Sequence, residues 1–291
     1  MPELPEVETV CRALKPHLVG RRITDVRALT AKLRTPLSTP TLRAFCEGRK
    51  ILDIRRRAKY IIVDLSASPF GNRKSTSENS APHALLLHLG MTGFCRIRPT
   101  AEPLEKHTRV TFTLDNGQQW RFLDPRKFGS VECCELRTPG GDPAELDQHG
   151  VEPLETGFTT EFLWQKSRGR NTPAKCLLMD QATVVGIGNI YASEACFRAG
   201  IRPQRPAGKL TRAECAKLVK ESRAVLRAAI KCGGTTISDF SSVDGTEGHF
   251  DTKLNVYGRT DQPCPRCGDA HHIQKLTLGG RSSFYCAKCQ R

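Results

Sequence analysis

The sequence predicts a multidomain α+β protein, and three observations lead to that prediction. Short strand-like segments separated by turn signals fill the chain from about Ile23 to Leu136. Helical periodicity replaces them in the second half, and two Cys-x-x-Cys pairs close the chain. Because 291 residues exceed the usual single-domain size of roughly 100–200 residues, we expect two domains.

The composition favours a polyanionic partner. The net charge of +15 and the isoelectric point near 9.4 attract nucleic acid first and acidic membrane second. The sequence contains no long basic amphipathic helix of the kind that binds a membrane surface. Its apolar runs are all far shorter than the roughly 20 residues of a membrane span. The N-terminus lacks a basic-then-apolar signal pattern, so we expect a cytosolic protein. Ribosome-associated proteins share such a charge, so charge alone does not identify the partner.

Residues 5–18 are predicted to form the first helix. Pro5 suits the first helical turn, where its missing N–H costs nothing. Glu6 and Glu8 then lie near the positive end of the helix dipole. Apolar residues recur every three or four positions and therefore share one face of this helix: Val7, Val10, Cys11, Leu14 and Leu18. The opening stretch MPELPEVETV thus places three carboxylates next to the amino terminus of a basic protein.

The next segments read as strands of a sandwich or barrel. Turn signals such as Asp115-Asn116-Gly117 separate them. The expected strands span residues 51–54, 60–65, 85–89, 94–97, 109–114, 120–123 and 129–134. The polar stretch 66–82 predicts a disordered loop between two strands. Residues 137–150 contain Pro139-Gly140-Gly141 and are predicted to form a linker.

Helices follow the linker, over residues 160–166, 189–199 and 211–231. The longest opens with Thr211 and Glu214 in capping-box register and ends at Gly233-Gly234. Its predicted inner stripe comprises Cys215, Leu218, Val219, Ser222, Leu226, Ala229 and Ile230. A polar, glycine-containing stretch at 238–249 predicts a mobile loop.

Four of the 13 cysteines predict a zinc site. Cys264, Cys267, Cys286 and Cys289 form two knuckles with 18 residues between them, a spacing that closes a structural tetrahedron around one Zn²⁺. Paired redox thiols are the alternative. So short a unit buries little core, and we expect the metal to hold it together. The basic side chains of this unit favour binding to nucleic acid. A basic surface that only faces water is the alternative. Several of the other nine cysteines lie on apolar helix faces and are expected to be small buried hydrophobes, and a disulfide framework is not expected.

Four motifs in order carry a family resemblance: PELPEVE at residues 2–8, DPRKFG at 124–129, GIGNIYASE at 186–194, and the four-cysteine unit. Together they resemble the family of formamidopyrimidine-DNA glycosylases and endonuclease VIII, over nearly the whole chain. The resemblance implies a monomeric, bacterial cytoplasmic enzyme of base excision repair. Such an enzyme removes oxidised purines, 8-oxoguanine and formamidopyrimidines, from double-stranded DNA and then nicks the strand by β,δ-elimination.

The resemblance also implies a domain plan. A catalytic β-sandwich domain would span residues 1–136, and a linker would span 137–150. A helix–two-turns–helix DNA-binding domain would span 151–260, with a lesion-recognition loop near 235–250. A zinc finger would span 261–291.

The resemblance assigns the catalytic chemistry to five residues. Pro2, exposed by loss of Met1, would be the Schiff-base nucleophile, because an α-amino pKa of about 8 leaves a neutral fraction at cell pH. Glu3 would be the proton donor. Lys59 and Arg281 would contact phosphates and donate protons for β- and δ-elimination, respectively. Glu6 would orient the amine, with a purely helix-dipole role as the alternative.

Further residues are implied to contact DNA. Met91, Arg126 and Phe128 would fill the hole left by a flipped base, and Arg126 would pair with the orphaned cytosine. The alternative for Met91 and Phe128 is a place in the core. Asn189 would bind phosphate at a helix N-terminus. Lys175 would belong to the same basic lining, and Tyr191 would be structural or a secondary phosphate contact.

Three rivals remain at this point. An endonuclease VIII-like enzyme for oxidised pyrimidines is the first, although Leu4 favours the purine branch. A non-catalytic binder of damaged DNA is the second, and the Pro2-Glu3 pair argues against it. A zinc-stabilised RNA binder is the third, and it leaves the N-terminal acids unexplained.

Overall fold

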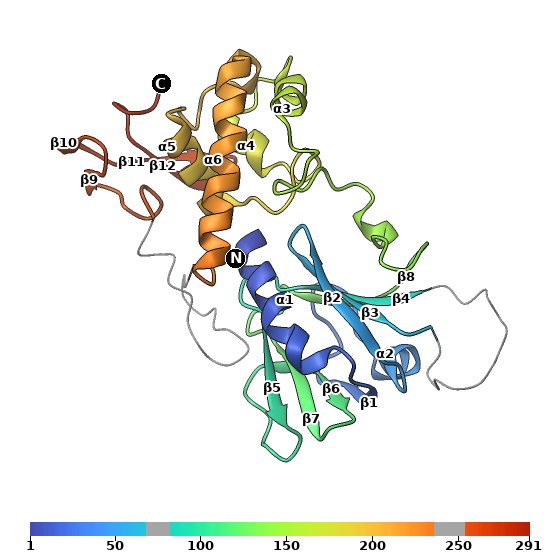
Figure 1. The fold of residues 1–291 in the computed structure, drawn as a ribbon. Coiled ribbons are helices and arrows are strands. Elements are labelled where there is room, and N and C mark those ends of the chain that lie inside the picture. The colour runs from blue at the N-terminus through green and yellow to red at the C-terminus, as the bar shows by residue number, and fades with distance from the viewer. Residues whose placement is uncertain (68–81, 236–253) are drawn as a thin grey trace. The chain divides into compact units, whose positions relative to one another are not determined.

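The computed structural model of the chain describes residues 1–67, 82–235 and 254–291 (Figure 1). Contacts divide these residues into two compact units. The N-terminal unit comprises residues 1–147 together with Thr235, and the C-terminal unit comprises 148–234 and 254–291. Most of the expected 66–82 loop, and the expected lesion loop beyond Thr235, lie outside the described residues.

Two four-stranded antiparallel sheets form the described part of the N-terminal unit, as expected for a sandwich. Their strand orders are β1-β6-β7-β5 and β2-β3-β4-β8. The elements are α1 (Leu4–Leu18), β1 (Ile23–Ala28), α2 (Thr39–Cys46), β2 (Ile51–Arg57), β3 (Tyr60–Leu65), β4 (His83–His88), β5 (Phe94–Pro99), β6 (Thr108–Leu114), β7 (Gln118–Leu123), β8 (Ser130–Glu135) and the 3₁₀ turn η1 (Ala144–Leu146).

Helix α1 and both sheets share one hydrophobic core. The predicted apolar face of α1 is buried, with Val7 and Leu14 fully inaccessible to solvent. These side chains pack in the same cluster as Ile54 from one sheet and Trp120 from the other. Burial of this face fixes α1, and therefore the residues immediately before it, against the sandwich.

Helix α2 and residues 137–150 depart from the sequence expectation. Helix α2 was not anticipated, although Ser38 caps it by accepting a hydrogen bond from the Thr41 amide. Residues 137–150 were expected as a linker, but η1 lies within them. Leu146 is buried there in a small cluster with Leu136 and Leu86, so this segment packs on the N-terminal unit.

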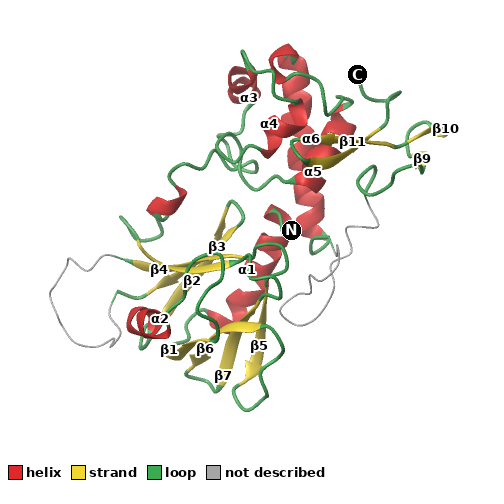
Figure 2. Ribbon diagram, turned by 180° about the vertical axis from the view of Figure 1, so that it is seen from behind, coloured by secondary structure: helices red, strands yellow, loops and turns green. Residues whose placement is uncertain are grey.

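The C-terminal unit combines helices with two small hairpins (Figure 2). Its elements are α3 (Thr160–Ser167), α4 (Ala174–Met179), α5 (Asn189–Ala199), the 3₁₀ turn η2 (Ala207–Lys209), α6 (Arg212–Lys231), β9 (Pro263–Cys264), β10 (Gly268–His272), β11 (Gln274–Leu278) and β12 (Arg281–Tyr285). The predicted capping box opens α6, with Thr211 as the N-cap. Helix α4 was not anticipated. No helix in the described ranges is long and apolar enough to cross a membrane.

The C-terminal hairpins are fastened to α5 by apolar contacts as well as by their cysteines. Phe197 of α5 packs in one cluster with Ile273 and Phe284 of the hairpin region. Gln290 adds hydrogen bonds, because its side chain accepts from the Cys286 amide and donates to the Ile201 carbonyl. The hairpins therefore have a core that they share with α5, in addition to the metal expected from the sequence.

Replacing a core side chain of α6 should destabilise the C-terminal unit. Leu226 is fully buried, so Leu226→Ala should lower the free energy of unfolding by about 2–5 kcal/mol. The matched control is Lys220→Ala on the exposed face of the same helix, which should stay within about 0.5 kcal/mol of the parent. Urea unfolding followed by circular dichroism measures both. Equal effects of the two substitutions would contradict the assigned inner face.

Candidate functional site

The N-terminus of α1 is organised by two buried carboxylates. Glu3 is the N-cap residue and Glu6 occupies the third helical position, and together they form a capping box. The Glu3 amide donates to Glu6 Oε2 at 2.8 Å. Each side chain is only 2% exposed. Because both acids have hydrogen-bonding roles within the fold, they fix the backbone that carries Pro2.

Glu6 also binds Thr235, which lies more than 200 residues later in the sequence. Its Oε1 atom accepts hydrogen bonds from the Thr235 amide and the Thr235 hydroxyl, each at 3.0 Å. Thr235 is buried and is the last described residue before the expected lesion loop. The sequence analysis gave Glu6 an orienting or a dipole role, and this link to Thr235 was missed.

The amine chemistry expected at Pro2 requires removal of Met1. Met1 is 39% exposed, whereas Pro2 is buried. While Met1 is attached, the Pro2 nitrogen is an amide without a nucleophilic lone pair. Removal of Met1 converts it into a secondary amine immediately beside Glu3.

Lys59 lies in the tight turn between β2 and β3. The register pairs Arg57 with Tyr60, so Ala58 and Lys59 form the turn, and Ala58 adopts a φ of 55°. The Lys59 side chain is only 8% exposed. Turn geometry therefore fixes this lysine more firmly than its sequence position suggested.

The arginines before Lys59 are paired rather than simply solvated. Arg56 contacts Glu8 of α1 at 3.2 Å. Arg55 contacts Asp64 at 2.7 Å. Arg57, two residues later, contacts Asp142 at 2.9 Å. The Asp64 and Asp142 carboxylates hold the pKa of Arg55 above its usual value, against the opposing effect of burial. These ion pairs tie the three arginines to α1, to β3 and to the segment after β8.

Asp124 joins the two loops that carry the expected hole-filling residues. Its Oδ1 atom accepts from the Thr92 hydroxyl at 2.8 Å, and its Oδ2 atom accepts from the Gly129 amide at 2.8 Å. Gly90 and Gly129 make close approach of the loops feasible. A Cβ atom on Gly90 would lie 2.5 Å from the Phe128 carbonyl carbon, and one on Gly129 would lie 2.7 Å from the His88 oxygen.

The expected hole-filling side chains project from these loops into solvent. Met91 is 42% exposed and Phe128 is 47% exposed. The Arg126 guanidinium lies over the Phe128 ring, 4.7 Å from its centroid. Their exposure favours the contact role over the alternative of a place in the core, because neither side chain is enclosed by the sandwich.

A pocket of about 280 Å³ adjoins these loops. Met1, Met91 and Phe128 contribute to its lining, so it brings the chain terminus together with the exposed loop residues. Arg34 and His88 also line it, and the sequence analysis missed both. The available signal for His88 was its position at the end of a strand, three residues before Met91.

In the C-terminal unit, a buried lysine fixes the beginning of α5. Lys175 is fully buried, and its Nζ atom donates to Asn189 Oδ1, to the Ser282 carbonyl at 3.0 Å and to Ser283 Oγ at 2.7 Å. Asn189 Nδ2 in turn donates to the Ser282 carbonyl at 3.0 Å. The helix end expected to bind phosphate is therefore held by the Lys175 side chain of α4 and the Ser282 carbonyl of β12.

Glu194 anchors the first residues that follow the undescribed segment. This fully buried carboxylate accepts hydrogen bonds from the Asn255, Val256 and Tyr257 amides at 2.8–3.0 Å. Tyr257 then places its hydroxyl 3.4 Å from Asn189 Nδ2. The GIGNIYASE motif thus contains both the candidate phosphate residue and the acid that supports its surroundings.

The remaining predicted contacts differ in accessibility. Tyr191 is fully buried, which favours the structural alternative for this residue. Arg281 is exposed and opens β12, directly after Gly279 and Gly280. Of the two, only Arg281 presents its side chain to solvent, and Ser282 and Ser283 beside it contact Lys175.

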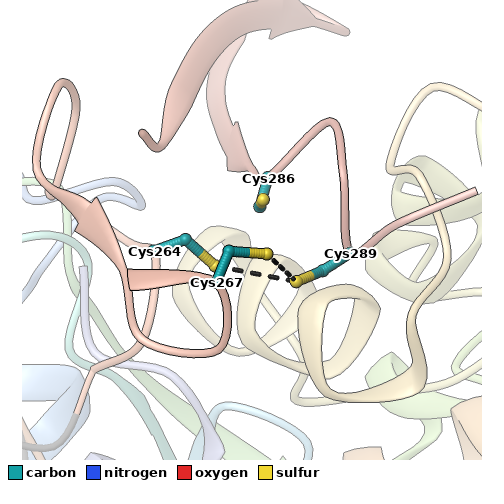
Figure 3. Close-up of side chains that lie close together, drawn as sticks. All are labelled: Cys264, Cys267, Cys286 and Cys289. Carbon is teal, nitrogen blue, oxygen red and sulfur yellow. Dashed lines mark hydrogen bonds between the residues drawn. The ribbon is translucent and has the colours of Figure 1, made fainter. Parts of the chain in front are cut away.

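The four predicted cysteines converge as a metal site (Figure 3). Their sulfur atoms all lie within 4.8 Å of one another. The Cys264 and Cys289 sulfurs are 3.7 Å apart and the Cys267 and Cys289 sulfurs are 3.0 Å apart. Sulfurs gathered at this spacing can share one Zn²⁺ with Zn–S bonds of about 2.3 Å. Four thiolates leave no open position for catalysis, so the donor set fits one structural Zn²⁺. None of the chain's cysteines forms a disulfide.

Comparisons with known proteins agree with this arrangement. Three family models match: the formamidopyrimidine-DNA glycosylase N-terminal domain over residues 1–131, the formamidopyrimidine-DNA glycosylase H2TH domain over 149–241, and a zinc finger found in FPG and IleRS over 261–291. A formamidopyrimidine-DNA glycosylase from Stenotrophomonas maltophilia is 47% identical, and one from Acidithiobacillus ferrooxidans is 42% identical. Each match covers 100% of both chains.

Solved structures are similar over almost the full chain. The MutM (Fpg) protein from Thermus thermophilus is 36% identical with a TM-score of 0.81, covering 99% of this chain and 98% of that one. The Lactococcus lactis Fpg in complex with DNA containing an abasic site is 30% identical with a TM-score of 0.84, covering 99% of both chains.

Zinc removal should loosen the C-terminal hairpins and leave the N-terminal unit folded. The purified protein should contain one zinc per chain, and Cys289→Ala should lose it, whereas Cys176→Ala should keep it. Chelation should then raise amide hydrogen exchange in β11 and β12 but not in β2 to β4, because only the former adjoin the cysteine cluster. Elemental analysis and exchange mass spectrometry measure these outcomes. Unchanged exchange in the zinc-free hairpins would overturn a structural role for the metal.

Proposed function

The chain belongs to the formamidopyrimidine-DNA glycosylase family, and from that premise we propose that Pro2 and Glu3 carry its chemistry. The protein is a DNA glycosylase of base excision repair that also has lyase activity at abasic sites. The observation that carries the assignment of residues is the buried start of α1. There Glu3 directly follows Pro2, and Glu6 holds the Glu3 backbone.

The proposed reaction begins once Met1 has been removed. The neutral Pro2 amine attacks C1′ of the damaged nucleoside, the bond to the base breaks, and an iminium forms between the enzyme and the sugar. Glu3 donates the proton that opens the sugar ring. The iminium acidifies the C2′ proton, so its loss expels the 3′ phosphate by β-elimination. A δ-elimination then expels the 5′ phosphate.

Oxidised purines are the proposed substrate class. The curated relatives are named formamidopyrimidine-DNA glycosylases, and similar structures include a MutM complex with DNA containing carbocyclic 8-oxoguanine. Extracting a base from the duplex costs a few kcal/mol, and exposed Met91 and Phe128 are suited to fill the gap. Arg126, supported on the Phe128 ring, would donate to the orphaned cytosine.

Phosphate binding is assigned to residues of both units. We propose that Lys59 and Arg281 contact phosphates and supply protons to the β- and δ-elimination steps. Asn189 would bind phosphate at the positive end of α5. Lys175 is proposed to act by positioning Asn189, because its Nζ donors are directed to acceptors within the protein.

We further propose that the protein acts as a monomer in the bacterial cytoplasm. The support is the charge of +15, which suits a polyanionic duplex, and the base-repair activity of the family, which requires access to the chromosome.

Borohydride should trap a covalent adduct with duplex DNA that contains 8-oxoguanine opposite cytosine. Reduction of the iminium makes the bond between Pro2 and the sugar permanent, so the intact mass of the adduct should show protein that lacks Met1. Pro2→Gly retains only a primary amine and should trap far less. Glu3→Gln should slow base release by about 10²–10⁴-fold, the usual contribution of a general acid.

An abasic-site duplex provides the control, since it needs no base release. Glu3→Gln should still form an adduct on that DNA. Adducts in protein that retains Met1, or no adduct with the parent protein, would refute Pro2 as the nucleophile. A panel that compares oxidised purines with oxidised pyrimidines tests the substrate class separately.

Arg281→Ala should weaken binding to every duplex tested by a similar factor. Removal of one phosphate contact should also reduce the slope of log affinity against log salt concentration by about 1. The matched control is Lys288→Ala, another exposed cation in the same zinc unit. Fluorescence anisotropy across a salt series measures both variants. If the two variants show the same slope, Arg281 has no specific phosphate role.

A further inference from the structure

The loop after β7 carries Arg126, and an arginine from the neighbouring strand holds this loop. Arg109 lies in β6, which pairs with β7 in the same sheet. Its Nε atom donates to the Asp124 carbonyl at 2.8 Å, and one of its terminal nitrogens donates to the Pro125 carbonyl at 3.3 Å. The Arg109 guanidinium therefore binds two successive carbonyls at the point where the chain leaves β7.

The peptide unit that precedes the Arg126 side chain is held at both ends. Its carbonyl belongs to Pro125 and accepts the hydrogen bond from Arg109. Its N–H belongs to Arg126 and is directed to Asp124 Oδ1 at 3.2 Å and to the Thr92 hydroxyl oxygen at 3.3 Å. Because a peptide unit is planar, holding both ends restricts the direction in which the Arg126 side chain leaves the backbone.

The same loop contains a backbone conformation that needs such support. Lys127 follows Arg126 and adopts a φ of 58°, in the left-handed region that residues other than glycine seldom occupy. Arg126 and Phe128 are exposed, so burial does little to fix them. A strained segment with exposed side chains keeps one conformation only when its surroundings hold the backbone. Arg109 supplies that support from β6, and the Asp124 carboxylate supplies it from within the loop.

We propose that Arg109 is a positioning residue that determines how strictly the enzyme requires cytosine opposite the damaged base. The inference rests on the proposed contact between Arg126 and the orphaned cytosine. A guanidinium group discriminates between bases only when it is aligned with the acceptors of one base edge. Without Arg109 the Pro125 carbonyl loses a donor, and Arg126 gains orientations in which it can contact another base. Arg109 acts through the loop and does not touch the DNA.

A direct phosphate contact is the competing role for Arg109. The side chain is partly buried, and two of its guanidinium nitrogens donate to the carbonyls of Asp124 and Pro125. The nitrogen that contacts Pro125 also lies 3.3 Å from His107 Nδ1. These contacts direct the guanidinium toward the protein. The two roles predict different salt dependence, because a lost phosphate contact lowers the slope of log affinity against log salt concentration by about 1.

Single-turnover release of 8-oxoguanine opposite cytosine and opposite adenine tests the proposal. Arg109→Met keeps an apolar stem and removes the donors. The preference of the parent protein for cytosine should therefore fall about fivefold, the low end of what one well-placed pairing with a base contributes. Arg109→Lys keeps the charge but lacks the rigid fork that reaches two carbonyls, so it should show a similar loss. The matched control is Arg27→Met at an exposed position of the neighbouring strand β1, which should retain the preference of the parent.

Fluorescence anisotropy across a salt series separates positioning from phosphate binding. Arg109→Met should keep the salt slope of the parent protein, because no phosphate contact is removed. A slope lowered by about 1, or an unchanged preference for cytosine, would overturn the positioning role. Full preference in Arg109→Lys would also overturn it, because charge alone would then suffice. Thermal unfolding shows which variants are folded, and Arg109→Lys decides the matter if Arg109→Met is not.

The parent protein separates failure of this inference from failure of the proposed function. A parent that releases no 8-oxoguanine from either duplex would contradict the proposed function. An active parent whose preference is shared by Arg109→Met would contradict only the role of Arg109. Equal release opposite cytosine and adenine by the parent would contradict the Arg126 contact and, with it, this inference.

Discussion

The hydrogen bonds to the Glu6 carboxylate are the constraint on which the N-terminal centre depends. One oxygen accepts from the Glu3 amide and the other accepts from the amide and hydroxyl of Thr235. Each buried donor left without its partner would cost about 1–3 kcal/mol, so the arrangement is strongly determined. It fixes the backbone beside Pro2 and, at the same time, the residue that leads into the segment after Thr235. This explains why a basic protein begins with acids: the carboxylates there organise backbone donors and are not surface charge.

A buried carboxylate organises an irregular segment at two other points of the structure. Asp124 holds the loops that bear Met91 and Phe128, and Glu194 gathers the amides that begin at Asn255. In each case a buried carboxylate binds backbone N–H groups or a hydroxyl, which stabilises an irregular segment that has few ladder hydrogen bonds of its own. The exposed residues on these segments are thereby held in place although they contribute little to the core. Rigid support of exposed side chains is what recognition of a distorted duplex requires.

Prediction from sequence succeeded where the signal was local. The apolar stripe of α1 and the capping box of α6 mark both helices, and turn signals between short β-rich segments marked the expected strands. Helix α2 escaped because it is only eight residues long and buries only Leu42 and Cys46, so its helical spacing occurs once and does not repeat. The burial of Lys175 was also beyond local reasoning, since two of its acceptors come from a strand more than 100 residues later. Contacts that join distant segments are fixed by the fold and leave no pattern around the residue itself.

The burial of Lys175 also clarifies how the positive charge is used. A lysine whose Nζ atom donates to three acceptors within the protein offers a phosphate little directly. Its effect is to fix Asn189 at the start of α5, where the helix dipole already favours an anion. A pre-set amide would lose little conformational entropy on binding the proposed phosphate. In the proposed complex, exposed Arg281 would add the salt-sensitive attraction to phosphate that a buried lysine cannot provide.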